Sequence, residues 1–164
     1  MTSCVYRDAG PLQRLVRATA ASRPLAWLYA RIQEPLDTLV YRLSRHRTTL
    51  SSWLAGVQLV MLTTTGARTG RRRTSPVLAI RDGDGFIVIA SNFGQPRHPA
   101  WYHNLRAEPH AWAEVAGRGR AVRARELHGA ERDRCFARGV EIYPGFEHYV
   151  RRAGRTIPVL RLDP

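Results

Sequence analysis

Four arginines and several hydroxyl-bearing side chains crowd into one short segment, residues 66–75, with the sequence GARTGRRRTS. Its two glycines, Gly66 and Gly70, permit a tight turn whose backbone N–H groups converge as an anion-binding nest. Arginine forks hold phosphate groups bidentately, so the turn combines fixed donors with positive charge. The lysine-containing ending of a nucleotide P-loop is absent. The segment therefore predicts a phosphate site, with a solvated basic hairpin tip as the alternative.

A second segment that could do chemistry, residues 91–105, reads SNFGQPRHPAWYHNL. It predicts a strand that ends in a polar, glycine-bearing loop, followed by a helix that begins with aromatic residues. Such a strand end offers backbone donors and acceptors to a flat heterocycle. Trp101 and Tyr102 either line the edge of that heterocycle or pack in the core. His98 and His103 are candidate metal or acid–base groups. No third ligand stands at a useful spacing, so we expect no metal site.

The overall charge points to an acidic partner. The chain has 164 residues, 44% of them hydrophobic, which suits one domain with one packed core. Its 26 basic residues, all arginine, outnumber 13 acidic residues and give a formal charge of +13, although a GC-rich genome also explains an arginine bias. A phosphorylated cofactor, nucleic acid or an anionic membrane surface would suit this charge. The arginines are spread along the chain without a helix-turn-helix, zinc-finger or RNP-like motif, so we expect no nucleic-acid partner.

Residues 1–56 predict a helical extension. Apolar residues recur there at helical spacing, with arginines on the opposite face: Leu25, Leu28 and Ile32, then Leu36, Leu39, Val40 and Leu43. The pattern is typical of an arm that packs on the domain or a partner, or of a basic amphipathic helix on a membrane. We find no membrane-spanning segment, no signal peptide and no cysteine motif at Cys4 and Cys135. We therefore expect a cytoplasmic protein, with peripheral contact at the inner face of the membrane as an option.

Residues 57–164 predict about six short strands, joined mostly by hairpins. We expect strands at residues 57–62, 74–80, 86–91, 111–115, 120–127 and 156–160, and helices at 100–107, 131–142 and 146–152. Hairpin links imply an antiparallel sheet, and a sheet of this size buries both faces by closing into a small barrel. Pro158 predicts that the last strand lies at a sheet edge. The expected class is α+β, with one domain over residues 1–164.

Four ordered motifs in this region resemble the deazaflavin (coenzyme F420)-dependent nitroreductase and quinone reductase family. They are residues 63–66 with Arg68, Thr69, Gly70, Arg73 and Pro76; residues 90–91 with Gly94, residues 98–102, Asn104 and Leu105; Tyr143 and Pro144 with Tyr149; and residues 155–159. The match covers around two-thirds of the chain, from Val57 onward. Together the four motifs are far more specific than any one of them.

The resemblance implies a split β-barrel of the flavin-reductase type, with flanking helices, that binds F420, an 8-hydroxy-5-deazaflavin with a phosphate and an oligoglutamate tail. It places the phosphate at the first motif, with Arg68 and Arg73 as clamps. It places the ring along the following strand and its neighbour. The cofactor-binding residues that it implies are Ala67, Arg68, Thr69, Arg73, Thr74, Ser75, Pro76, Val77, Leu78, Ile89, Ala90, Ser91, Asn92, Ala100, Trp101, Tyr102, His103, Asn104 and Phe146.

The resemblance also implies an F420H2-dependent oxidoreductase, in which the cofactor delivers hydride and the protein supplies position and electrostatics. Solvent, Ser91, Tyr143 or Tyr149 supplies the proton, and these three side chains are the candidate catalytic residues. The nitroreductases carry tyrosines through residues 143–149, whereas the middle aromatic position here is Phe146. The missing hydroxyl favours a quinone over a nitro compound as acceptor.

Two alternatives stay open on the sequence alone. FMN is also flat and phosphorylated, so composition does not separate an FMN-dependent split-barrel reductase from an F420-dependent one. The alternative from another class is a non-enzymatic protein that binds a cofactor or nucleic acid without turnover. The sequence gives no oligomeric state.

Overall fold

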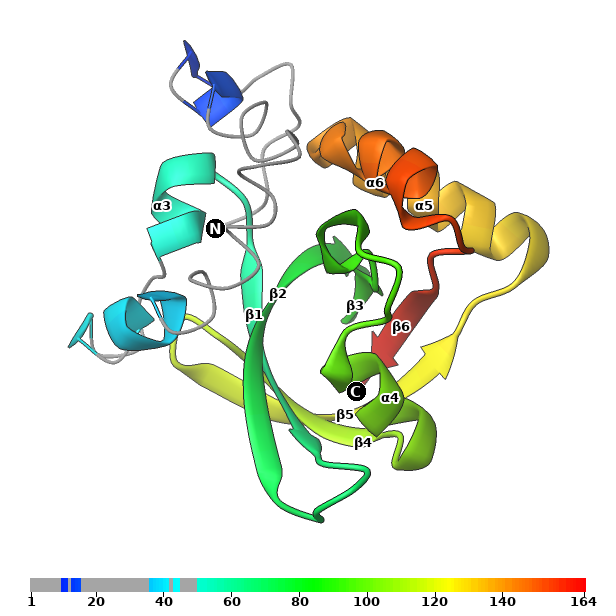
Figure 1. The fold of residues 1–164 in the computed structure, drawn as a ribbon. Coiled ribbons are helices and arrows are strands. Elements are labelled where there is room, and N and C mark those ends of the chain that lie inside the picture. Colours follow the sequence, from blue (N-terminus) through cyan, green and yellow to red (C-terminus); the bar gives the residue numbers. More distant parts are fainter. Residues whose placement is uncertain (1–9, 12, 16–35, 42, 45–49) are drawn as a thin grey trace.

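The computed structural model describes residues 10–11, 13–15, 36–41, 43–44 and 50–164. Within that part of the chain, six strands form one closed barrel in the order β1-β2-β3-β6-β5-β4 (Figure 1). The strands are β1 (Leu59–Thr65), β2 (Arg72–Asp82), β3 (Gly85–Ile89), β4 (His110–Val115), β5 (Arg118–Glu126) and β6 (Val159–Asp163). Every neighbouring pair is antiparallel, as the hairpin links predict.

The barrel interior is filled by side chains that alternate along the strands. Val60 of β1, Val88 of β3 and Leu162 of β6 meet there and are fully buried. Helix α4 (Ala100–Ala107) contributes to the same cluster through Trp101, Tyr102 and Leu105. Because three large side chains of α4 enter the barrel, the helix and the loop before it are fixed against the strands.

A second core lies outside the barrel, under helices α5 (Gly129–Ile142) and α6 (Gly145–Ala153). Figure 1 shows these two helices together on one side of the barrel, next to β6. Ile87 and Ile89 of β3 belong to this cluster together with Phe146 of α6. The alternate residues of β3 face the interior, so the strand is buried on both faces, as its apolar sequence predicts.

The described parts of the N-terminal extension include helical segments. Residues 36–41 are helical, and α3 (Leu50–Ala55) precedes β1. The Tyr41 hydroxyl donates to Glu114 Oε1 of β4 at 2.8 Å and accepts from the N–H of Gly117 at 3.2 Å, which attaches the extension to the barrel. Among the described helices, none is both long and apolar enough to cross a membrane. The predicted helix with Leu25, Leu28 and Ile32 lies outside the described residues.

Strand boundaries differ from the sequence expectation by up to three residues, most of all in β1 and β6. The threonines at residues 63–65 continue β1, and the Thr63 and Thr74 hydroxyls share a hydrogen bond of 2.7 Å across to β2. The last strand begins at Val159, after Pro158, and lies between β3 and β5. The predicted edge position of this strand is therefore wrong, because a closed barrel of this kind has no edge.

Candidate functional site

The turn between β1 and β2, residues 66–71, is held by its own hydrogen bonds. The N–H of Gly66 donates to the Arg71 carbonyl at 2.9 Å, and those of Thr69 and Gly70 donate to the Gly66 carbonyl at 3.1 and 2.8 Å. The N–H of Arg71 donates to Thr69 Oγ1 at 3.3 Å. Most backbone donors of the turn are thus used internally. The predicted backbone nest is wrong in this form, and the turn offers its arginine side chains instead.

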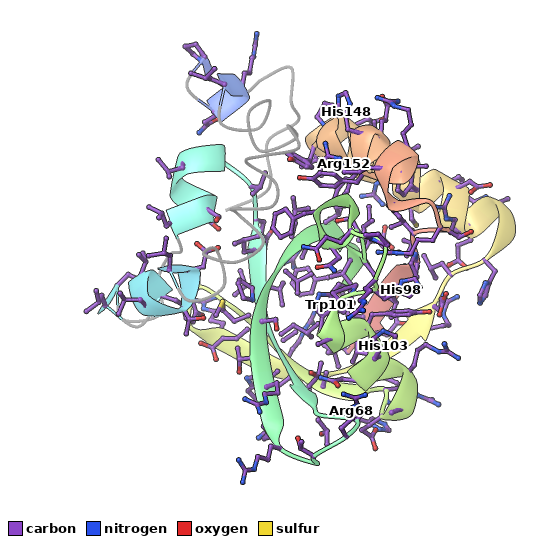
Figure 2. The ribbon with its side chains drawn as sticks, in the orientation of Figure 1. Arg68, His98, Trp101, His103, His148 and Arg152 are labelled. Carbon is purple, nitrogen blue, oxygen red and sulfur yellow. The ribbon has the colours of Figure 1, made fainter. Side chains whose placement is uncertain are left out.

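Four exposed arginines surround this turn: Arg68, Arg71, Arg72 and Arg73. Figure 2 labels Arg68 at this end of the β1–β2 hairpin. None of the four forms an ion pair with a carboxylate within the described residues. Crowded like charges repel, and an anion bound among them relieves that repulsion. These side chains have the charge and the donors that a phosphate-bearing ligand needs.

Asn104 of α4 ties the arginine turn to the rest of the fold. Its side-chain oxygen accepts from the N–H of Ala67 at 3.0 Å, and its amide nitrogen donates to Thr64 Oγ1 at 2.9 Å. Asn104 and Thr64 are both buried. The amide predicted to contact the cofactor is therefore engaged at both ends within the protein, where it sets the position of the turn relative to α4.

The loop after β3 has an unusual backbone. Asn92 and Phe93 have φ angles of 49° and 56°, in the left-handed region, and Gly94 follows at 74°. Each non-glycine residue there costs about 1–2 kcal/mol, so neighbouring groups must hold the loop. Gly94 lies directly on α6, where an added Cβ would stand 3.0 Å from Tyr149 Cα. The predicted ring contacts Ser91 and Asn92 therefore belong to a fixed loop.

Arg155, between α6 and β6, holds the same loop from its other side. Its guanidinium donates to the carbonyls of Ala90, Ser91, Gln95 and Arg97 at 3.2–3.3 Å. Sequence reasoning gives Arg155 no role in the site, although the residue opens the C-terminal motif. Only the pairing of β6 with β3 brings it to this loop, and no spacing in the sequence shows that pairing.

The predicted ring contacts divide between the two faces of the barrel wall. Val77 of β2 and Ala90 belong to the interior cluster, whereas Leu78 of β2 and Ile89 of β3 pack with the outer cluster. Side chains on opposite faces of one sheet do not meet the same planar ligand. The predicted set therefore cannot consist entirely of side-chain contacts, and a ligand on one face reaches the rest only through backbone.

The predicted cofactor contacts on helix α4 also face different ways, some into the core and others toward solvent. Trp101 and Tyr102 are buried, and the Tyr102 hydroxyl donates to Glu126 Oε2 of β5 at 3.0 Å, whereas His103 is exposed. The His98 ring centre lies 4.8 Å from that of Tyr102, and burial lowers the pKa of His98. No cluster of His, Cys, Asp and Glu in the described residues is suited to hold a metal ion.

The three aromatic residues at the start of and within α6 form a compact group. The hydroxyls of Tyr143 and Tyr149 share a hydrogen bond of 2.8 Å, and the Phe146 ring meets the Tyr143 ring edge-on at 5.3 Å. All three are buried, Tyr149 to 2% exposure. Burial raises the pKa of Tyr149 to about 12. Burial and the shared hydrogen bond therefore keep the Tyr149 hydroxyl protonated and away from solvent.

Comparison with known proteins shows the family to which the chain belongs. A family model described as F420H(2)-dependent quinone reductase matches residues 37–164. The chain belongs to this family. It is 36% identical over 108 residues to the F420H(2)-dependent quinone reductase Rv1261c of Mycobacterium tuberculosis strain H37Rv, covering 63% of this chain and 71% of the relative. It is 33% identical to the putative F420H(2)-dependent quinone reductase Rv3178 of the same strain, covering 66% and 91%.

Solved structures agree with membership of the F420H(2)-dependent quinone reductase family. An F420-H2 dependent reductase of type FDR-A superposes with a TM-score of 0.60 at 34% identity, over 65% of this chain and 94% of that one. A domain-swapped dimer superposes at 0.63 and 29% identity, over 86% and 100%. The predicted split barrel of the flavin-reductase type and the predicted family of oxidoreductases are both confirmed. FMN, the alternative cofactor, gains no support from the family.

Proposed function

We propose that this member of the F420H(2)-dependent quinone reductase family transfers reducing equivalents from reduced F420 to a quinone. Two observations carry the proposal: four exposed arginines that have no carboxylate partner among the described residues, and a strand end whose loop is held in a fixed shape. An anionic cofactor with a flat ring needs both features: positive charge for its phosphate and tail, and a rigid edge for its ring.

The residues that would hold the cofactor fall into two groups. Arg68, Thr69 and Arg73 would bind the phosphate, and Asn104 would keep their turn in place through the N–H of Ala67. Ser91 and Asn92 would meet the ring. When bound, the reduced deazaflavin supplies the hydride. The protein's part is to place the ring edge, exclude water and leave the Ser91 hydroxyl near the reacting end.

A quinone suits the acceptor side better than a nitro compound. The middle position of the aromatic group is Phe146, which carries no hydroxyl, and the hydroxyls of Tyr143 and Tyr149 are bonded to each other. A nitro group gains most from free hydroxyl donors, whereas a flat apolar quinone gains from aromatic surface. Phe146 therefore favours the quinone.

We also propose that the N-terminal extension touches a membrane surface, where apolar quinones dissolve. Three leucines at helical spacing in residues 36–43 are exposed: Leu36 by 39%, Leu39 by 52% and Leu43 by 75%. An exposed leucine stripe on a chain with a charge of +13 has the properties of a segment that lies on anionic lipid.

The deciding experiment mixes the purified protein with reduced F420 and menadione and follows the returning absorbance of the oxidised deazaflavin. We expect protein-dependent oxidation that Arg68→Ala and Arg73→Ala lower at least tenfold in kcat/KM. Arg134→Ala is the matched control, because Arg134 is an exposed arginine on α5, away from the turn. Absence of both oxidation and coenzyme binding in the unaltered protein would refute the proposal, and FMN would be tried next.

A further inference from the structure

Among the described residues, the Arg155 side chain is bonded only to backbone carbonyls. Its Nη2 atom donates to Ala90 and Ser91 at 3.3 Å each and to Arg97 at 3.2 Å, and its Nε atom donates to Gln95 at 3.3 Å. A further bond of 3.3 Å runs from Nη1 to the carbonyl of the next residue, Thr156. One guanidinium thus gathers four carbonyls of the loop between β3 and α4.

No carboxylate among the described residues neutralises Arg155. The side chain is part-buried, and burial lowers the pKa of Arg155 from its usual value. A part-buried charge without a counter-ion is costly. The five N–H donors of the guanidinium serve carbonyls that the two donors of a neutral amide could not all reach. The carbonyl groups gathered around Arg155 therefore take the place of a counter-ion, and the positive charge acts on those groups.

The charge reaches the predicted ring contacts through one peptide group. The Ser91 carbonyl, which accepts from Arg155, belongs to the same peptide as the N–H of Asn92. A cation bonded to that oxygen withdraws electron density and makes the N–H a stronger donor. The Arg97 carbonyl accepts hydrogen bonds from Arg155 and from Asn92 Nδ2, the second at 2.9 Å. By fixing that carbonyl, the guanidinium also helps to hold Asn92, whose backbone is left-handed.

We propose that Arg155 is a positioning residue for the ring of F420: it holds residues 90–92 in the conformation that receives the ring edge and strengthens the donors there by its charge. This inference rests on the proposed function. Different arginines then serve the two ends of one site. Arg68 and Arg73 would bind the phosphate at the β1–β2 turn, and Arg155 would act at the end of β3. Loss of Arg155 should then disturb ring placement more than overall coenzyme binding.

The test compares Arg155→Met, Arg155→Lys and Arg132→Met. Arg132 is the matched control, because it is also part-buried and donates to a backbone carbonyl of the same C-terminal segment, Ile157, at 3.1 Å, yet does not touch the loop after β3. For each protein we would measure the melting temperature, the dissociation constant of oxidised F420 by fluorescence quenching, the absorption spectrum of the bound coenzyme, and kcat and KM with menadione.

We expect Arg155→Met to lower kcat at least tenfold, to weaken coenzyme binding no more than about tenfold and to shift the spectrum of the bound coenzyme. Arg155→Lys should restore part of kcat, since it keeps the charge and loses the fork. Arg132→Met should lower only the melting temperature. A normal spectrum and kcat in Arg155→Met would overturn the inference. If that variant does not fold, Arg155→Gln, which keeps two N–H donors and removes the charge, takes its place. A normal kcat and spectrum in Arg155→Gln decides against the inference, and an altered kcat and spectrum decides for it. Failure of the unaltered protein to bind F420 would instead overturn the proposed function.

Discussion

The side-chain oxygen of Asn104 accepts a hydrogen bond of 3.0 Å from the backbone N–H of Ala67, so a residue inside helix α4 fixes the start of the arginine turn. The same amide donates to Thr64 Oγ1 of β1 at 2.9 Å. The aromatic residues of α4 pack in the interior cluster of the barrel. The hydrogen bonds of Asn104 therefore fix the position of the turn relative to the core. Placement of the charges therefore depends on a residue that need not contact the ligand.

Replacement of Asn104 by alanine should destabilise the fold and weaken coenzyme binding together. The variant leaves the buried Thr64 hydroxyl and the Ala67 N–H without partners, which costs about 1–3 kcal/mol for such groups. Urea denaturation measures the loss, and fluorescence quenching measures the coenzyme affinity. Arg106→Ala, at an exposed position of the same helix, serves as control and should change stability by no more than about 0.5 kcal/mol. Equal stability of Asn104→Ala and the unaltered protein would contradict this role.

Coenzyme binding should weaken steeply as salt is added. The four arginines of the turn are exposed, so their attraction for an anion is screened when the Debye length shortens to a few ångström, about 3 Å at 1 M salt. A plot of the dissociation constant against salt should be shallower in Arg68→Ala and Arg73→Ala, whereas Arg134→Ala should keep the original slope. A dissociation constant independent of salt would show that the turn does not bind the anionic end.

Gly139 of α5 is required for the approach of that helix to the barrel. A Cβ at this position would collide with Ile89 Cδ1 of β3. Gly139→Ala should therefore cost about 1–3 kcal/mol by overpacking, although alanine favours helix. Ile89→Val removes the obstructing methyl group, so the double variant should recover part of the loss in a double-mutant cycle of unfolding free energies. Additive effects of the two changes would contradict the contact.

The strand and helix types in the barrel followed from local signals, because apolar runs, helical spacing and hairpin turns are visible within short windows of sequence. The helix at residues 100–107 and the apolar β3 were predicted for this reason. Pro158 misled the prediction of strand order, since a proline just before a strand gives the same signal as one at an edge. Closure of the barrel depends on the pairing of β1 with β4, which is a long-range relationship.

The candidate site was predicted less evenly than the fold. The arginine turn was found because its residues are consecutive in sequence. Arg155 was missed, since it joins the loop after β3 only through the fold. Tyr143 and Tyr149 were predicted as candidate proton donors, and no pattern in the sequence showed that packing of α6 on the barrel buries them against each other. Residue types and motifs do not report which way a side chain faces once helices pack.

The buried tyrosine should make stability depend on alkaline pH. Burial raises the pKa of Tyr149 to about 12, while the unfolded chain has the ordinary value near 10. Between these values the unfolded form releases its proton first, so the stabilisation is complete below about pH 10 and is lost as pH rises toward 12. Urea unfolding at pH 9, 10 and 11 should show a shallower fall for Tyr149→Phe. Phe136→Leu, a control that removes no titrating group, should keep the slope.

The same variant tests the chemistry. Because the Tyr149 hydroxyl is buried and bonded to Tyr143, Tyr149→Phe should keep kcat for menadione within about threefold of the unaltered protein. A fall of more than tenfold, with the melting temperature taken into account, would return Tyr149 to the list of proton donors.

Lipid binding should depend on the exposed leucines of the extension. We expect the protein to cosediment with vesicles that contain anionic lipid, and less so with neutral vesicles, because the chain carries a charge of +13. Replacing Leu36, Leu39 and Leu43 by serine should reduce cosedimentation at least fivefold, since each exposed leucine that enters the lipid loses contact with water. Val150→Ser is the control, because Val150 is 40% exposed on α6, away from the extension. Equal cosedimentation of the triple variant and the control would mean that arginine charge alone carries the binding. If the unaltered protein does not cosediment, the membrane contact is wrong, and the reductase activity is judged by its own assay.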